Sequence, residues 1–242
     1  MFRKILSSSS FLLAGIFVVG FYPGDSSKTT ISFSGNLGQY AEIQRGCSGN
    51  IIKKDKIPIQ EADISINRKP VPYFRLGLNG ILVNSKRESY YLNDRYETIP
   101  EFHSYSISLV HPNANLETKY FGLGIGYFWS TDYLPELDWQ NSLTGYLRIG
   151  NPRSAFFDIS VLHTMPLSSG YFQVGFGKIN DPRPNWWVGL GLTPYDALGL
   201  SIKLQTHLKD RFYLDSNTRI GVSEGIFEGT LGFGITYKIP DN

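Results

Sequence analysis

Catalysis would need a nucleophile beside a base, and two stretches of the chain offer those residue types. His163 is followed closely by Ser168 and Ser169 in LHTMPLSSG, where the imidazole could activate a hydroxyl group. No nearby acidic residue is placed to orient the histidine, so the alternative is a polar strand end followed by a turn. Residues 221–225, GVSEG, have the Gly-x-Ser-x-Gly form of a nucleophile elbow but lack its strand–turn–helix context. We predict no catalytic site and keep His163, Ser168 and Ser169 as weak candidates.

Motifs for cofactors, metals and nucleic acids are also missing from the sequence. The chain has no Gly-rich phosphate loop, no His-Glu-x-x-His segment and no cysteine pair with metal-binding spacing. Its single cysteine, Cys47, cannot form an internal disulfide and is expected in a loop. The formal net charge of +2 gives no electrostatic reason to expect nucleic acid binding. We therefore predict no cofactor, no metal site and no nucleic acid partner.

The N-terminal segment differs in character from the rest of the chain. Arg3 and Lys4 precede an uncharged, largely apolar run that continues to Gly20, which is the arrangement of a secretory signal peptide. We expect residues 1–20 to be a signal peptide cleaved near Gly20 and residues 21–242 to form a single domain. An uncleaved membrane anchor is the alternative. No later segment has the roughly 18 consecutive apolar residues that a transmembrane helix needs.

Alternation of bulky apolar and small residues dominates the rest of the sequence. In YFGLGIGYFW, residues 120–129, Phe121, Leu123 and Ile125 lie on one face of an extended strand and glycines lie on the other. In SYSISLVH, residues 104–111, the same rule places Ile107 and Leu109 on the apolar face and the serines opposite them. This period of two indicates β-strands, and no segment shows a long helical period.

The alternating segments and the turn residues between them allow the strands to be counted. We predict an all-β fold of about 12 strands, with 10 as the fallback. The predicted strands are 29–44, 58–68, 71–84, 104–111, 117–129, 140–149, 154–163, 170–178, 185–193, 197–208, 211–221 and 228–239.

The connections between these strands predict two unlike ends. One set is short and includes RKPVP, HPNANLE and NPRS, whereas the other set begins with the long segments 47–56, 85–103 and 130–139. Short turns at one end and longer loops at the other are typical of barrels that span an outer membrane.

The second strand face decides between a soluble barrel and a membrane barrel. It consists mainly of Gly and Ser with isolated charges, whereas a face in contact with water would carry many Lys, Glu and Thr. We therefore expect the bulky face to meet hydrocarbon and the small face to line the lumen, where glycine leaves room for long neighbouring side chains. Tyr127 and Trp129 are expected near the outer membrane boundary, and Trp186 and Trp187 near the periplasmic one.

In this architecture the chain resembles bacterial outer-membrane β-barrel proteins of the small porin-like kind. The last strand carries the most specific resemblance, because Thr230, Gly232, Ile235 and Tyr237 match the C-terminal targeting signal of such proteins, although three further residues follow. The resemblance implies a closed antiparallel up-and-down transmembrane barrel in the envelope of a Gram-negative bacterium. It also implies two partners, outer-membrane lipid and the barrel-insertion machinery.

The predicted lumen is polar and of mixed charge. The lumen would either contain a narrow channel for a small solute or be filled by salt-bridged side chains, and in the second case the protein would be a structural surface protein. The predicted lumen-facing residues are Arg75, Arg148, Asp158, Gln173, Lys203, Gln205, His207, Asp215, Asn217, Arg219 and Lys238.

Two alternatives of other classes stay open at this stage. An outer-membrane barrel hydrolase acting on lipid or lipopolysaccharide would use His163 with Ser168 or Ser169. A soluble exported β-barrel binder would instead turn its apolar face inward. The segment 85–103, which contains Tyr90, Tyr91 and Tyr96, is expected to be a loop that folds into the mouth of the barrel or binds a molecule outside.

Overall fold

The computed structural model is a barrel of antiparallel strands without described helices. It describes residues 28–45, 51–92, 98–130, 141–164, 170–179, 184–192 and 198–239. The predicted signal peptide, Cys47 and the serine pair Ser168 and Ser169 lie outside these ranges. The strands are β1 (Thr29–Arg45), β2 (Ile51–Val71), β3 (Phe74–Leu92), β4 (Thr98–Glu117), β5 (Phe121–Ser130), β6 (Asn141–Asn151), β7 (Ala155–Thr164), β8 (Gly170–Lys178), β9 (Asn185–Leu192), β10 (Leu198–Lys209), β11 (Phe212–Ser223) and β12 (Ile226–Ile239).

Each strand pairs with its neighbours in sequence, and β1 pairs with β12, so the sheet closes on itself. Thr29 at the start of β1 lies opposite Ile239 at the end of β12, which places both ends of the barrel sheet at the same rim. The prediction of a closed, all-β, 12-stranded antiparallel barrel is therefore confirmed. Among the described residues, no helix is long and apolar enough to cross a membrane.

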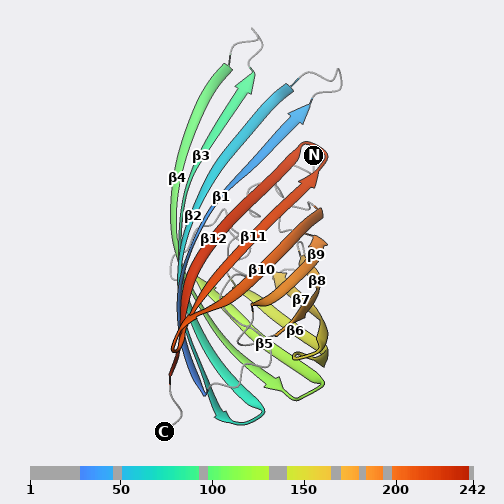
Figure 1. Ribbon diagram of the computed structural model, residues 1–242. Helices are drawn as coiled ribbons and strands as arrows, with labels where there is room; N and C mark the ends of the chain where they lie inside the picture. Colours follow the sequence, from blue (N-terminus) through green and yellow to red (C-terminus); the bar gives the residue numbers. More distant parts are fainter. Residues whose placement is uncertain are drawn as a thin grey trace.

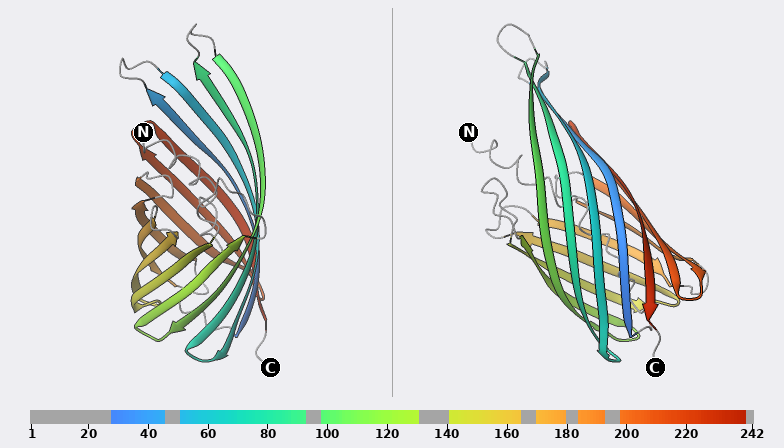
Figure 2. Two further views of the ribbon diagram at one scale, coloured as in Figure 1. Left: turned by 180° about the vertical axis from the view of Figure 1, so that it is seen from behind. Right: turned by 90° about the vertical axis from the view of Figure 1, so that its left-hand side faces the viewer.

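The barrel is taller on one side than on the other. Strands β1 to β4 are 17 to 21 residues long, whereas β5 to β9 are 8 to 11 residues long. The long strands rise together above the rest as a curved wall (Figures 1 and 2). We call the upper part of β2, β3 and β4 the outer wall; it comprises residues 51–60, 84–92 and 98–108, and β1 pairs with its β2 edge through residues 37–45.

The lengths of β3 and β4 correct two of the predicted connections. The segment 85–103 is not a loop, because β3 continues to Leu92 and β4 begins at Thr98. HPNANLE is not a turn, because residues 111–117 are the last part of β4. Both segments are poor in apolar residues, so their alternation was weak, but main-chain pairing with a neighbouring strand continues through them.

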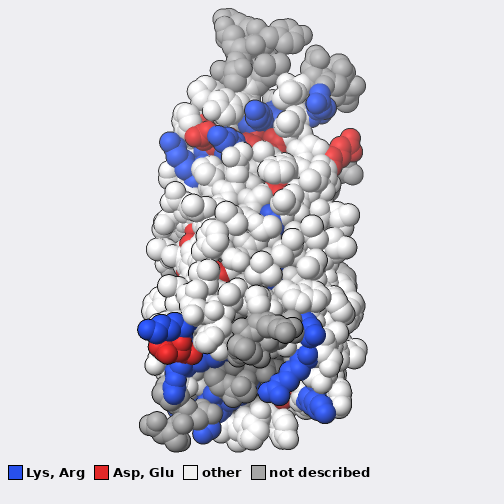
Figure 3. Space-filling model, in the orientation of Figure 1, with Lys and Arg blue, Asp and Glu red and all other residues white. Residues whose placement is uncertain are grey.

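Apolar side chains form a belt on the outside of the barrel. Phe33, Leu78, Ile125, Leu190 and Leu231 represent five strands of this belt, and each is at least half exposed. In Figure 3 the charged residues of the visible face gather toward the upper and lower ends, with few between them. These large apolar side chains point outward, and in a soluble protein they would be in contact with water. A soluble barrel with its apolar face inward is therefore excluded.

Three residues contradict the predicted orientation. Ile107 and Leu109 are only 1% exposed and point inward, so the serines of that segment face outward. The pattern of β4 is inverted here because Ile107 and Leu109 lie opposite the buried Val83 and Ile81 of β3, where the inner face of the barrel is apolar. Trp187 is also buried and does not belong to an aromatic belt, whereas Trp129 is exposed as expected.

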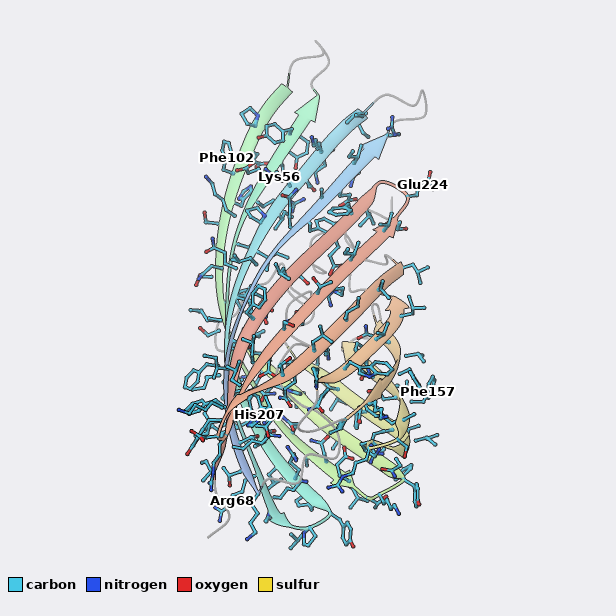
Figure 4. The ribbon with its side chains drawn as sticks, in the orientation of Figure 1. Lys56, Arg68, Phe102, Phe157, His207 and Glu224 are labelled. Carbon is cyan, nitrogen blue, oxygen red and sulfur yellow. The ribbon has the colours of Figure 1, made fainter. Side chains whose placement is uncertain are left out.

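The GVSEG segment comprises the end of β11, residues 221–223, and the hairpin turn of residues 224–225 that leads to β12. Ser223 pairs with Ile226, and Glu224 lies at the tip of the turn (Figure 4). Gly225 has a φ of 72°, and a Cβ there would lie 2.5 Å from the carbonyl oxygen of Ile43. Gly225 therefore serves the turn, Gly221 is a paired residue of β11, and no nucleophile elbow is formed.

Candidate functional site: the barrel interior

Eight of the eleven residues predicted to face the lumen are buried in the structure. The other three, Lys203, His207 and Lys238, each lie two residues from a buried position of the same strand and share its side of the sheet. The buried eight are Arg75, Arg148, Asp158, Gln173, Gln205, Asp215, Asn217 and Arg219.

The glycines of β5 leave space for long side chains of the strand beside it. A Cβ at Gly122 would lie 2.8 Å from a carboxylate oxygen of Glu117, and one at Gly124 would lie 2.0 Å from the amide oxygen of Asn115. A Cβ at Gly126 would lie 2.4 Å from a ring nitrogen of His111. Polar side chains from β4 therefore lie flat against the inner surface of β5, where any larger residue would displace them.

One buried ion pair uses this space. Arg148 of β6 reaches across β5 to Glu117 of β4, with a distance of 2.7 Å between Nη2 and Oε2. The same guanidinium donates hydrogen bonds to the carbonyl oxygens of Thr118 and Gly150. Arg148 has no exposed surface, so its charge is balanced entirely by protein groups.

A second cluster crosses β8 in the same manner. The indole nitrogen of Trp187 donates to both carboxylate oxygens of Asp158, at 2.9 and 3.0 Å. Its ring lies over Gly175 and Gly189, where a Cβ would approach ring carbons to 2.2 and 2.1 Å. The ammonium group of Lys203 lies 4.7 Å from the ring centre of Trp187. An anion, an aromatic ring and a cation are thus stacked along β7, β9 and β10.

The third cluster joins the first strands to the last. Asn36 of β1 donates hydrogen bonds to Glu61 and Asp63 of β2, at 3.1 and 3.2 Å. Its amide oxygen accepts a hydrogen bond from Asn217 of β11 across Gly232, whose Cβ would lie 1.6 Å from that oxygen. This cluster stabilises the closure of the barrel, because it bridges the strands on both sides of the β1–β12 seam.

Further polar contacts continue the lining around β9 to β12. Asn185 donates to Gln205 at 3.0 Å, and Gln205 donates to Asp215 at 2.8 Å. Arg219 forms an ion pair with the buried Glu228 at 2.6 Å. The contacts described here join strands that are adjacent or separated by a single strand, so they run around the wall.

Sequence reasoning missed most of the acids of this lining. Glu61, Asp63, Glu117 and Glu228 are buried and face inward. Glu61 and Asp63 alternate with outward-facing residues of a predicted strand. The rule that successive side chains point to opposite faces would therefore have identified both as lumen-facing. Glu117 is the last residue of the predicted turn HPNANLE and the first of the predicted strand 117–129, where the pattern does not decide its direction.

The interior also contains an apolar strip that the sequence did not reveal. It runs diagonally from β1 to β5 in the outer half of the barrel, and all its members are nearly inaccessible. The strip consists of Tyr40, Ile57, Ile59, Ile81, Val83, Ile107, Leu109 and Phe128.

The predicted hydrolase residues do not form a described site. His163 lies in β7 opposite Leu143 of β6, but its side chain is outside the described part of the structure, as are Ser168 and Ser169. His207 donates a hydrogen bond from Nε2 to the carbonyl oxygen of Asp210, 2.8 Å away, and packs on Tyr213 near the lower rim, where Figure 4 labels it. The described residues contain no group of three or more His, Cys, Asp or Glu that could hold a metal ion.

The outer wall carries a charged cluster above the apolar belt. Asp55 is buried and lies 2.6 Å from a guanidinium nitrogen of Arg87 and 3.0 Å from the ammonium nitrogen of Lys53. Burial by itself raises the pKa of Asp55, but hydrogen bonds with Lys53, Ser89 and Arg87 outweigh it and hold this pKa below its ordinary value.

Comparison with known proteins identifies the fold. No protein-family model and no curated protein sequence matches the chain. The COG4313 outer membrane channel from Pseudomonas putida F1 has a TM-score of 0.58 at 11% identity, covering 90% of this chain and 99% of that chain. The toluene transporter TodX of P. putida has a TM-score of 0.56 at 6% identity, with 98% and 94% covered. The β domain of the Bordetella autotransporter BrkA has a TM-score of 0.53 at 12% identity, with 87% and 100% covered.

These likenesses, at low identity, concern the fold. The predicted resemblance to outer-membrane β-barrels is confirmed at that level. A closed barrel whose outer surface is an apolar belt spans a membrane, and barrels of this architecture are those of bacterial outer membranes.

Proposed function

We propose that the protein is a narrow, non-enzymatic outer-membrane channel for small solutes. The observation that carries the proposal is the direction of the interior contacts. The Arg148–Glu117 pair, the Asp158–Trp187 contact and the Asn36 cluster run along the wall rather than toward the axis. A lining built in this way stabilises the strands without needing contacts between side chains from opposite sides of the barrel.

The fold likenesses support the proposal without identifying a solute. The COG4313 protein is named an outer membrane channel and TodX a toluene transporter. Because their identity to this chain is so low, the solute class has to come from the chain's own lining. That lining combines cations and anions, so we expect passage of small polar solutes with weak ionic selectivity.

Conductance in planar bilayers tests this function. The full chain, refolded in detergent and checked by heat-modifiable gel mobility, should produce small, stable conductance steps. Lys203→Gln removes a cation from the interior and should shift the reversal potential in a salt gradient toward cation preference. Lys54→Gln removes the same charge from the outer wall and should leave the reversal potential unchanged.

Two results would contradict a channel. A folded protein that inserts but never conducts would support the structural surface protein instead. Equal shifts from Lys203→Gln and Lys54→Gln would show that the current does not pass along the described interior.

The targeting signal and its partner remain part of the proposal. Thr230, Gly232, Ile235 and Tyr237 all lie in β12, which closes the barrel against β1. Replacing both Ile235 and Tyr237 by Ser should lower assembly by the barrel-insertion machinery in cells. Replacing Leu231 and Phe233, which are also exposed on β12, by Ser provides the matched control.

A further inference from the structure

The outer end of β2 and β3 contains a groove of about 540 Å³ that the proposed channel function does not use. Three lysines and one acid line it together with two tyrosines and two isoleucines, so its charge is positive. The lining residues are Ile51, Ile52, Lys53, Lys54, Lys56, Glu88, Tyr90 and Tyr91.

Two of these lysines are available for a ligand. Lys53 is bound to Asp55, whereas Lys54 and Lys56 form no ion pair with any of the described residues. Lys54 and Lys56 are exposed on β2 and alternate with the buried Asp55, which places them on the outward face of the wall. Figure 4 shows Lys56 in this upper part of the wall, near Phe102.

Lys86 extends the positive surface toward the membrane. It is exposed on β3, and its ammonium nitrogen lies 5.1 Å from the ring centre of Phe102. Glu88 is the acid on this face, and it lies opposite Lys56 in the register of β2 and β3. Lys54, Lys56 and Lys86 therefore outnumber it, and Figure 3 shows basic side chains together with some acidic ones at this end of the barrel.

The distance of these lysines from the apolar belt indicates which part of a lipid can reach them. Leu82, paired with Ala62, is the last large apolar residue of the belt on β3, and Asn84 follows it on the outward face. At about 3.3 Å per residue and a tilt of about 40°, Lys86 stands roughly 10 Å above Leu82. By the pairing register, Lys56 and Lys54 stand roughly 15 and 20 Å above it.

A phospholipid headgroup is too short to reach all three lysines. Headgroup regions extend about 5–8 Å beyond the hydrocarbon on each side of a bilayer. A headgroup made of several phosphorylated sugars extends much further and brings anionic groups to every one of these heights. Tyr90, which lines the groove, offers a flat ring and a hydroxyl group suited to a sugar face.

We propose that the outward face of the outer wall, formed by Lys54, Lys56, Lys86 and Tyr90, binds the phosphorylated saccharide headgroup of a glycolipid in the outer leaflet. The inference uses the outer-membrane placement of the barrel and takes the rim of the outer wall, opposite the rim where Thr29 and Ile239 pair, as the outer one, but it does not require that solutes pass through the lumen. A barrel that binds the glycolipid without conducting would overturn the channel and leave this site intact.

Binding of a defined glycolipid to the full chain in detergent micelles tests the site. The probe is lipid A carrying both phosphates and two acidic core sugars, followed by native mass spectrometry over a dilution series. The test variant is Lys54→Gln/Lys56→Gln/Lys86→Gln. Its matched control is Arg68→Gln/Lys119→Gln/Lys209→Gln, which removes the same charge from exposed positions at the opposite rim.

The test variant should bind the glycolipid on the order of 100-fold more weakly, and the control should stay within about threefold of the parent. Dephosphorylated lipid A and phosphatidylglycerol should both bind the parent weakly, which distinguishes the phosphorylated saccharide from acyl chains and from a simple anionic lipid. Heat-modifiable mobility establishes that each variant is folded, and Lys56→Gln alone replaces the triple variant if that one does not fold.

Three outcomes would overturn the site. They are equal losses in the two triple variants, unchanged binding in the test variant, and equally tight binding of dephosphorylated lipid A by the parent.

Discussion

The position of a charge relative to the apolar belt should determine how strongly it destabilises the barrel. Ile125 is 62% exposed at the middle of β5, between Phe121 at one end of the strand and Trp129 toward the other. Phe102 is 55% exposed on the outward face of β4, but it lies opposite Glu88 in the outer wall. The two side chains have similar exposure and differ in the medium that surrounds them.

The expected magnitudes follow from that difference. An arginine at the bilayer midplane costs about 2–4 kcal/mol, whereas one near or beyond the interface costs about 0–1 kcal/mol. Ile125→Arg should therefore lower the free energy of unfolding by about 1–4 kcal/mol more than Phe102→Arg does. Ile125→Ala removes apolar surface without adding charge and separates the two contributions.

Reversible urea unfolding in phosphatidylcholine vesicles, followed by tryptophan emission, measures these differences. If Phe102→Arg destabilises the protein as much as Ile125→Arg, the belt does not end where the structure places it. If Ile125→Arg behaves like Ile125→Ala, Ile125 does not face hydrocarbon and the orientation of the whole strand is wrong.

The remaining predictions concern the interior and the outer wall. Gly175→Ala should displace the indole of Trp187, break its contact with Asp158, and shift the tryptophan emission, whereas Gly229→Ala should be tolerated because the atoms nearest its Cβ lie 3.5 Å away. Arg87→Gln should destabilise the protein by about 1–3 kcal/mol at pH 7, because the buried Asp55 loses a partner. The pKa of Asp55 in the folded protein is below its unfolded value of about 3.9, so its stabilising contribution is complete above that pH and is lost as the pH falls through the folded pKa. The difference between parent and Arg87→Gln in urea unfolding should therefore shrink from pH 7 to about pH 3, and a constant difference would argue against the ion pair.

The sequence determined the barrel and the orientation of most of its strands. Alternation along YFGLGIGYFW places Ile125 outward and Gly124 inward, because successive side chains of a strand point to opposite faces. Charged side chains and unpaired strand edges both cost free energy in hydrocarbon. A membrane-spanning sheet therefore needs an apolar outer belt and has to close into a barrel. The same parity placed Arg148 and Asp158 inside without knowledge of their partners.

Tertiary structure alone decided which residues meet inside and where the belt ends. Arg148 finds Glu117 two strands away because Gly122 lies between them, a coincidence of register that no single strand records. Ile107 and Leu109 point inward because they pair with the buried Val83 and Ile81 of β3, and the sequence of β4 alone does not record this pairing. The alternation of residue types shows which side chains share a face of a strand. The position of each residue along the barrel axis depends instead on how its strand pairs with its neighbours, and that position determines whether the residue contacts hydrocarbon or water.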